Sequence, residues 1–322
     1  MMRAIAHTDL EVFPICLGCN VFGWTVAQDE AFVVLDAFAE GGGNFFDTSD
    51  VYWKFLPGNV GGESETIIGE WMRQRRCRDR MVVSTKIGCL DGMTGGLTAS
   101  NIRRYTEASM KRLGVDTIDL LYAHTDDPDT PLEETLSGLD ALVRAGKVRY
   151  IAASRFGAER LARAAAIAQR EHLAGFAATQ SLYSLVERDF ETTHASVVDQ
   201  LGLSVMPYYA LAAGFLTGKY RPGTTTDSVR TAAEARPANP TLYLDAHGIA
   251  LLAVLDDVAE AHQTTVAAVS LAWLLAQDHV TATITSARTV SQLEGILPAA
   301  DLALTAEQVT RLGAAYSHSS LQ

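Results

Sequence analysis

Short apolar runs alternate along this chain with longer segments in which apolar residues recur at helical spacing. The apolar runs predict strands at 11–17, 44–46, 81–86, 118–124, 148–153, 176–179, 203–206 and 280–284. The segments between and after them predict helices at 29–40, 63–75, 98–113, 132–145, 158–171, 189–201, 242–262, 266–277, 289–297 and 305–316. This regular alternation predicts an α/β fold, a (β/α)8 TIM barrel that forms a single domain over residues 1–322.

One segment breaks the rhythm. Residues 220–239, after the seventh predicted strand, are rich in Thr, Pro and Ala and carry Arg221, Arg230 and Arg236. A loop of this length is usually a functional lid or a disordered segment, and we expect a lid. The last predicted helix, 305–316, should pack on the outside of the barrel.

Composition narrows the possible partners and locations. A net charge of -12 and a pI near 5.1 leave no basic face for nucleic acid or an anionic membrane. The chain has no apolar run of eighteen residues, and its N-terminus lacks the apolar core of a signal peptide, so we expect a soluble cytoplasmic protein.

Cys16 and Cys19 form a CxxC pair, which suggests a redox pair or half of a zinc site. No second CxxC completes a zinc shell. The pair also ends an apolar strand instead of opening a helix, where thiolates are stabilised. We therefore expect two structural cysteines and no metal.

Polar side chains stand at the ends of three consecutive predicted strands: Asp47, Lys86 and His124. Tyr52 follows Asp47 on the next loop. Each of these groups alone is most simply a solvated polar residue at a strand end, but parallel strands bring their carboxyl ends to one rim, where barrels hold their active sites. An unperturbed phenol has a pKa of about 10, so a nearby buried cation would help Tyr52 donate a proton near neutral pH.

Asp47, Tyr52, Lys86 and His124 together resemble the catalytic tetrad of the aldo-keto reductases. The similarity extends over nearly the whole chain, through Leu17-Gly18, VVSTKIG at 82–88, SLYSLVER at 181–188, GFLTGKY at 214–220 and ITSAR at 284–288. The resemblance implies reduction of an aldehyde or ketone by hydride transfer from NADPH, with Tyr52 as proton donor. Lys86 would lower the pKa of the phenol, Asp47 would hold Lys86 in place, and His124 would donate a hydrogen bond to the developing alkoxide.

The chain has neither a Gly-x-Gly-x-x-Gly after a strand nor a Walker motif. The resemblance instead implies a cofactor that lies extended across the strand ends. The nicotinamide would be lined by Gly18, Cys19 and Asn20, with Asp47 beside them, its carboxamide would be bound by Ser154, Arg155 and Gln180, and its ring would stack on Tyr208. The contacts to the pyrophosphate and the lid would come from Tyr209, Ala210, Leu211, Ala212, Gly214, Lys219 and Arg230. The adenosine end would be bound by Ser286, Arg288 and Gln292.

Several positions depart from the common family pattern. Arg155 follows Ser154 where most branches have Asn, as in the branch that includes potassium-channel β-subunits, and the segment 209–212 lacks the usual Pro. Arg288 would pair with a 2′-phosphate, which favours NADPH over NADH. Gly295 and Ile296 replace the usual readers of the adenine edge and weaken that contact.

Trp24, Trp53 and Phe55 either wall a substrate pocket, which would suit an aromatic or apolar carbonyl compound, or pack on their own loops. Rival functions are a cofactor-binding regulatory subunit of the channel type, a metal-dependent hydrolase and an aldolase that uses Lys86. The hydrolase would need more strand-end ligands than the sequence offers. The expected partner is a small carbonyl compound, and the sequence leaves the oligomeric state open.

Overall fold

The structure, a computed structural model, describes residues 1–91, 96–224, 231 and 238–316. Within these residues, eight parallel strands form the main sheet in the order β10-β3-β4-β5-β6-β7-β8-β9. Its ends meet where Val205 N donates to His279 O at 2.8 Å and Ile284 N donates to Pro207 O at 3.0 Å. The predicted (β/α)8 barrel is therefore confirmed. The strands are β3 Ile15–Gly18, β4 Phe45–Asp47, β5 Val82–Ile87, β6 Ile118–Ala123, β7 Val148–Ser154, β8 Phe176–Gln180, β9 Ser204–Val205 and β10 Thr283–Thr285.

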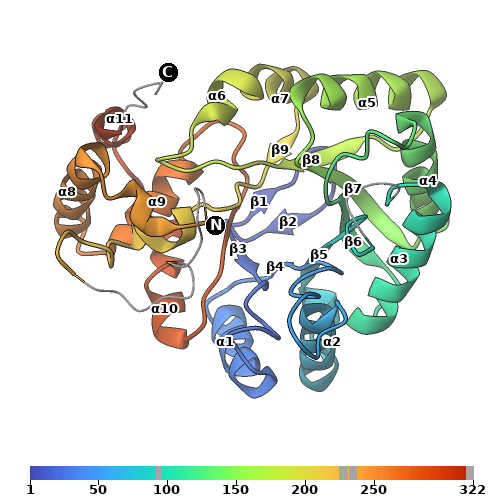
Figure 1. Cartoon of the computed structure of the whole chain (residues 1–322), viewed down its shortest axis with the longest axis horizontal. Coiled ribbons are helices and arrows are strands. Elements are labelled where there is room, and N and C mark those ends of the chain that lie inside the picture. Colours follow the sequence, from blue (N-terminus) through green and yellow to red (C-terminus); the bar gives the residue numbers. More distant parts are fainter. Residues whose placement is uncertain (92–95, 225–230, 232–237, 317–322) are drawn as a thin grey trace.

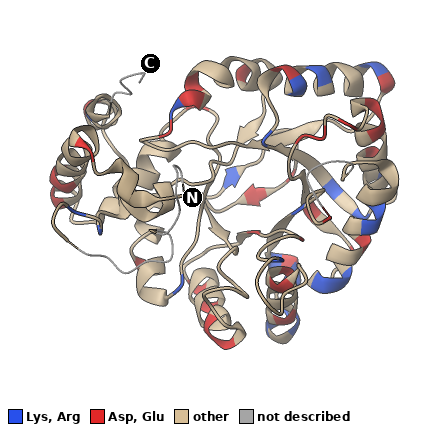
Figure 2. Ribbon diagram, in the orientation of Figure 1, with Lys and Arg blue, Asp and Glu red and all other residues tan. Residues whose placement is uncertain are grey.

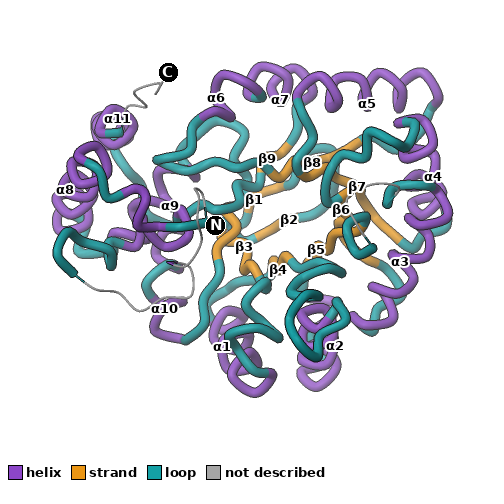
Figure 3. Tube along the Cα trace, in the orientation of Figure 1, coloured by secondary structure: helices purple, strands orange, loops and turns teal. Residues whose placement is uncertain are grey.

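The helices surround the strands (Figures 1 and 3). Charged residues are concentrated on these outer elements, above all on α2 to α5 (Figure 2), because only their outer faces meet water. The helices are α1 Gln28–Glu40, α2 Glu63–Arg75, α3 Ala99–Leu113, α4 Leu132–Arg144, α5 Ala158–Glu171, α6 Asp189–Thr193, α7 Ala195–Leu201, α8 Ala246–Ala261, α9 Val266–Leu275, α10 Val290–Glu294 and α11 Ala306–Ala315, with short 3₁₀ turns η1 Arg78–Arg80, η2 Ala212–Thr217, η4 Pro240–Tyr243 and η5 Leu297–Ala300. None of the described helices is long and apolar enough to span a membrane.

Successive strand residues face two separate apolar cores. Val82 and Leu120 belong to the cluster inside the barrel, whereas their neighbours Val83 and Leu121 belong to the cluster between strands and helices. This follows from the two-residue period of a strand that is buried on both faces. Cys16 joins the inner cluster and Cys19 the outer one, and burial raises the pKa of both thiols well above the ordinary value. Both cysteines thus serve as core residues.

The predicted first strand, 11–17, is divided in the structure between two strands, β2 and β3. β1 Arg3–Ala4 and β2 Glu11–Val12 form an antiparallel hairpin, and the barrel strand β3 starts only at Ile15. Pro14 lies between them and has no backbone N–H for a sheet ladder. In Figure 1 the hairpin lies across the middle of the ring of strands. Its apolar residues Ile5, Leu10 and Val12 join the inner cluster, so the hairpin covers one end of the barrel.

Three predicted helices also differ from those observed. The segment 189–201 breaks at His194, whose φ of -123° is not helical, and gives α6 and α7. The segment 242–262 begins as η4, and α8 starts after Asp245, whose side chain accepts from Gly248 N. The segment 289–297 yields only α10 before η5. The last helix, α11, packs against α8, where Arg311 Nη2 donates to Asp257 at 2.5 Å, so its outside position agrees with the prediction.

Candidate active site

A buried lysine at the end of β5 joins the strand-end residues into one cluster. Lys86 Nζ donates hydrogen bonds to Asp47 Oδ2 at 2.5 Å, to Thr48 O at 2.7 Å and to Tyr52 Oη at 2.7 Å. These three bonds use all three ammonium protons. Because the Tyr52 oxygen accepts from Lys86, its own proton is free to point elsewhere.

Asp47, the last residue of β4, is held on both carboxylate oxygens. Oδ2 faces Lys86, while Oδ1 accepts from Ser84 Oγ at 3.0 Å and from Gln180 Nε2 at 2.7 Å. The ion pair of Asp47 and Lys86 is almost fully buried, with both side chains 3% exposed. Such a pair is stable only when hydrogen bonds satisfy the remaining atoms, as they do here.

The protonation states of the cluster follow from burial and neighbouring charge. Burial alone would lower the pKa of Lys86, but Asp47 and Tyr52 outweigh it, and the net shift is upward. Burial raises the pKa of Tyr52 to about 12, although Lys86 acts in the opposite direction. At neutral pH the lysine is therefore charged and the phenol keeps its proton. The sequence prediction had Lys86 lowering this pKa, and the lysine does so, but by less than burial raises it.

His124 follows β6 and lies beside Tyr52, with the ring centroids 6.2 Å apart and the rings nearly perpendicular. Its Nδ1 lies 3.1 Å from Ser49 Oγ. Burial, Lys86 and Arg155 lower the pKa of this histidine well below its ordinary value, so the imidazole is neutral. Nε2 is the ring nitrogen left to face a substrate.

These four residues stand on the wall of a cavity of about 490 Å³ at the carboxyl ends of the strands. Tyr52, Lys86 and His124 line it from one side, with Asp47 among them. Most of the other predicted contacts line it too: Gly18, Asn20, Trp24, Ser154, Arg155, Gln180, Tyr208, Tyr209, Ala210, Leu211, Gly214, Lys219, Ser286, Arg288 and Gln292.

Several predicted contacts do not reach the cavity. Cys19 and Ala212 are fully buried behind the wall, so their side chains are closed to a ligand. Arg230 lies outside the described residues, as does Arg236. The predicted lid at 220–239 falls partly in the same undescribed stretch.

The three aromatic residues predicted to wall the substrate pocket lie in different surroundings. Trp24 lines the cavity, and Trp53 stacks on it with ring centroids 3.6 Å apart while donating through Nε1 to Asn20 O. Phe55 is 77% exposed and lies outside the cavity. The structure thus brings one of the three predicted aromatics to the wall and a second behind it.

The backbone after β9 is unusual. Tyr209, Ala212 and Ala213 all have φ between 46° and 55°, and Gly214 has φ of 101°. Left-handed conformations cost energy in residues other than glycine and often mark functional sites, because they turn backbone N–H groups toward one side. This stretch lies along the cavity wall beside Lys219, whose Nζ lies 5.0 Å from the Tyr220 ring.

The far end of the cavity contains Arg288, Gln292, Gly295 and Ile296. The Arg288 side chain is exposed, and no ion pair involves it within the described ranges. Its backbone N–H donates to Gln292 Oε1 at 2.9 Å, which ties the two residues together. Arg288, for which the sequence predicts pairing with a 2′-phosphate, therefore has an exposed guanidinium at the cavity.

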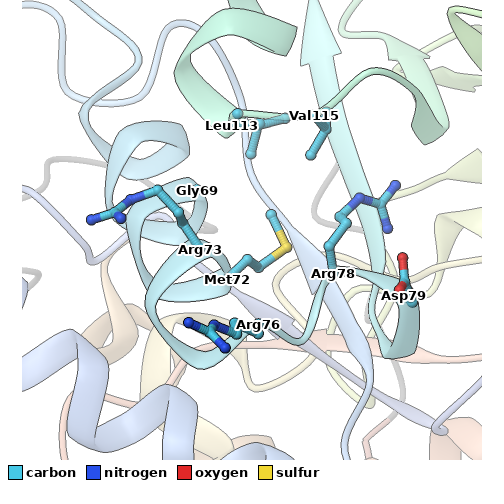
Figure 4. Close-up of a pocket in the computed structure, with 9 residues that line it drawn as sticks. Gly69, Met72, Arg73, Arg76, Arg78, Asp79, Leu113 and Val115 are labelled. Carbon is cyan, nitrogen blue, oxygen red and sulfur yellow. The ribbon is translucent and has the colours of Figure 1, made fainter.

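A second hollow, of about 290 Å³, lies between α2, η1 and the end of α3 (Figure 4). It presents three arginines, but Arg73 donates twice to Glu70, and Arg78 pairs with Asp119 at 2.8 Å. The hollow contains none of the tetrad residues. We therefore place the active site in the larger cavity.

Sequence reasoning gave no binding role to several residues of this region. Val21, Thr25, Ala213, Thr217, Thr265, Ala267, Ile284 and Thr285 also line the cavity. Ser49 and Asp50, directly behind His124, were not singled out either. Their only signal was their position between Asp47 and Tyr52, because the partners that give them a role come from other elements.

A parallel barrel with a buried cluster of ionisable residues at its carboxyl-terminal rim has the arrangement of an enzyme-type (β/α)8 barrel. The chain belongs to the aldo/keto reductase family, whose model matches residues 14–317. It is 34% identical to the oxidoreductase YrpG of Bacillus subtilis, over 94% of this chain and 92% of that protein. It is 31% identical to an aryl-alcohol dehydrogenase of Pestalotiopsis microspora (96% and 80%) and 30% identical to a probable voltage-gated potassium channel subunit beta of Arabidopsis thaliana (93% and 91%).

Proposed function

We propose that this protein is an NADPH-dependent reductase that converts an aldehyde or ketone to its alcohol, with Tyr52 as the proton donor. The observation that carries the proposal is the position of Lys86. Its ammonium bonds to Asp47 and Tyr52 together, 2.5 and 2.7 Å away, at the wall of the large cavity.

The cavity suits an extended dinucleotide. Gly18 lines the cavity without a side chain, and it packs closely on the neighbouring strand, because a Cβ there would lie 2.9 Å from Ser286 Oγ and 3.1 Å from Ile284 Cγ2. The backbone at 209–214 supports a pyrophosphate site, since Leu211 (φ -105°) is followed by the left-handed Ala212 and Ala213, and such changes of hand can form anion-binding concavities. Arg288 favours a cofactor with a 2′-phosphate, because a guanidinium can donate two parallel hydrogen bonds to phosphate oxygens. Gln180 already donates to Asp47, which leaves its carbonyl oxygen to accept from a carboxamide.

When bound, NADPH supplies a hydride to the carbonyl carbon. Tyr52 supplies the proton to the carbonyl oxygen, because its oxygen already accepts from Lys86 and its proton can face the cavity. Lys86 stabilises the resulting phenolate, and Asp47 keeps Lys86 charged and in place. The neutral His124 donates from Nε2 to the developing alkoxide.

The wall of the cavity favours an aromatic or apolar carbonyl compound. Trp24 offers a flat face, and its stacking on Trp53 holds that face in position. One of the relatives is named an aryl-alcohol dehydrogenase, which supports the same substrate class.

The similarity to a probable channel subunit raises a second function, in which the protein binds the cofactor and regulates a partner with little turnover. The complete cluster of Asp47, Lys86, Tyr52 and His124 favours the reductase.

The test is a fluorescence titration of the purified protein with NADPH and NADH, followed by the loss of reduced-nicotinamide absorbance with a panel of aromatic and aliphatic aldehydes and ketones. Binding with turnover of any carbonyl supports the reductase. Binding without turnover across the panel supports the regulatory function, and absence of binding would contradict both.

A further inference from the structure

A buried carboxyl group is linked to the histidine of the site through one hydroxyl group. Asp50, in the loop after β4, is 0% exposed, and its backbone N–H donates to Lys86 O at 3.1 Å. Its Oδ2 is also buried and has no hydrogen-bond partner in the part of the chain that the structure describes. An ionised carboxylate is costly in such a position, so the surroundings favour the neutral acid.

A second buried carboxylate strengthens this preference. Glu65 on α2 is also 0% exposed, and it accepts from Thr85 Oγ1 at 2.5 Å and from Arg112 Nε at 2.6 Å. The nearby arginine is therefore committed to Glu65. Burial, followed by Glu65, raises the pKa of Asp50 to about 8. The ionisable groups that interact with Asp50 are Glu65 on α2, Tyr105 on α3, Arg112 on α3, Lys86 on β5 and Cys89 after β5.

The Ser49 hydroxyl connects Asp50 to His124. Ser49 Oγ lies 3.4 Å from Asp50 Oδ1 and 3.1 Å from His124 Nδ1. It also accepts from Val51 N at 3.4 Å and lies 3.4 Å from Lys86 O. A hydroxyl has one proton and can donate in one direction at a time, so the direction that Ser49 takes is coupled to the protonation of its two neighbours.

We propose that Asp50 is a positioning residue that sets the tautomer of His124 through the Ser49 hydroxyl, and that only the protonated Asp50 leaves a proton on Nε2 for the substrate. The effect of the tautomer on catalysis rests on the proposed function, in which His124 donates a hydrogen bond to the substrate oxygen. The tautomer itself is a property of the protein without substrate.

The two states balance their protons. With Asp50 protonated, its O–H donates to Ser49 Oγ, Ser49 donates to His124 Nδ1, and the imidazole proton sits on Nε2. When Asp50 loses its proton, Ser49 donates to the carboxylate, His124 Nδ1–H donates to Ser49, and Nε2 becomes an acceptor that cannot stabilise an alkoxide. The choice is between two neutral tautomers because burial, Lys86 and Arg155 keep the pKa of His124 low.

The experiment is ¹⁵N NMR of the full-length protein with labelled histidine, without substrate or cofactor, from about pH 6 to pH 10, a range centred on the raised pKa of Asp50. His124→Gln assigns the His124 signal. We expect wild-type His124 to pass from the Nε2–H to the Nδ1–H tautomer with a midpoint near pH 8. In Asp50→Asn the side-chain amide donates to Ser49 at every pH, so His124 should stay Nε2–H throughout.

Two further variants keep the result unambiguous. Ser49→Ala removes the link, so the His124 tautomer should no longer follow Asp50. Asp140→Asn, a buried carboxyl on α4 away from the cavity, should leave the wild-type switch unchanged. A wild-type His124 that keeps one tautomer over the range, or an Asp50→Asn protein that switches as wild type does, would overturn the proposal.

Kinetics separate this inference from the proposed function. With a substrate found in the panel, wild-type kcat should fall about tenfold for each pH unit above the midpoint, and Asp50→Asn should remove that fall. A tautomer switch in a protein without turnover would retain the positioning role and reject the reductase. Turnover without a change of the His124 tautomer would support the reductase and reject the positioning role of Asp50.

Discussion

The ammonium of Lys86 donates to Tyr52 Oη at 2.7 Å from the same nitrogen that bonds to Asp47. One buried cation thus pairs with the carboxylate and orients the phenol. Because the phenol oxygen is already an acceptor, its proton is directed away from the lysine. We therefore expect the stability of the barrel rim and the proposed chemistry to depend on the same ammonium group.

Replacing Lys86 should lower both the stability of the protein and its turnover. Lys86→Met leaves Asp47 as a buried charge without its partner, which costs about 3–5 kcal/mol of unfolding free energy. Turnover should fall at least about 100-fold, since the phenolate loses its stabilising charge. Urea unfolding and steady-state kinetics measure the two effects. The control is Lys147→Met, which breaks an exposed pair with Glu107 and should change stability by less than about 1 kcal/mol.

Tyr52→Phe tests the proposed proton donor. The ring stays and the acid is lost, so kcat should fall by about 10²–10⁴ while the Kd for NADPH changes little. Tyr105→Phe, which removes a phenol bonded to Asp91 outside the cavity, is the matched control. Stopped-flow turnover and fluorescence titration give both values. Wild-type turnover in Tyr52→Phe would assign the proton to another group.

Arg288 should decide between the two nicotinamide dinucleotides. Arg288→Gln removes the charged fork proposed for the 2′-phosphate, at a cost of about 1.5–3 kcal/mol, or roughly 10- to 150-fold in the Kd for NADPH. The Kd for NADH, which lacks that phosphate, should stay nearly constant and serves as the internal control. An equal loss of affinity for NADPH and NADH would mean that Arg288 contacts a part of the cofactor other than the 2′-phosphate.

Trp24 should set the preference for aromatic substrates. Trp24→Leu removes the flat face of the wall and should raise KM for aromatic carbonyls by a factor that corresponds to about 0.5–1.5 kcal/mol, with a smaller effect on short aliphatic ones. Phe55→Leu, on a ring that is 77% exposed, should change neither. KM measured on matched pairs of substrates tests this; a uniform rise for both classes would contradict it.

Asp50 should also make stability depend on pH. An ordinary Asp has a pKa of about 3.9, so below that pH the carboxyl is protonated in both the folded and the unfolded chain and contributes no difference. Between that value and the folded pKa of about 8, the folded state holds a proton that the unfolded state releases. Each pH unit then costs folding up to about 1.4 kcal/mol.

Asp50→Asn removes this penalty. Its unfolding free energy minus that of the wild type should therefore increase as pH rises from 4 to 8 and then level off. Chemical denaturation at a series of pH values measures the difference, with Asp140→Asn as the control. A difference that does not change with pH would mean that Asp50 is ionised in the folded protein.

The sequence predicted the barrel well because most strands lie within short, largely apolar segments between amphipathic helices. Where it erred, a single residue changed the local geometry. Pro14 removes a ladder N–H and separates β2 from β3, and His194 leaves helical geometry between α6 and α7. Apolar periodicity alone does not register either event.

The candidate site was predicted where chemistry and strand position coincide, as at Asp47, Lys86 and His124. The roles of Ser49 and Asp50 were not, because they depend on neighbours far along the chain. Ser49 contacts a residue 75 positions away, and Glu65 obtains its charge partner from 47 positions away. The full burial of Cys19 and Ala212 likewise follows from packing that a list of motifs does not contain.

The closure of the barrel has a consequence for synthesis on the ribosome. Ile15 in β3 pairs with Thr283 in β10, and Arg3 in the hairpin donates to Leu275 O and Val280 O. The first barrel strand to emerge, β3, therefore has one edge unpaired until β10, one of the last segments, has been made. Until then that edge is exposed to other chains, so nascent protein at this stage is the form most in need of a chaperone.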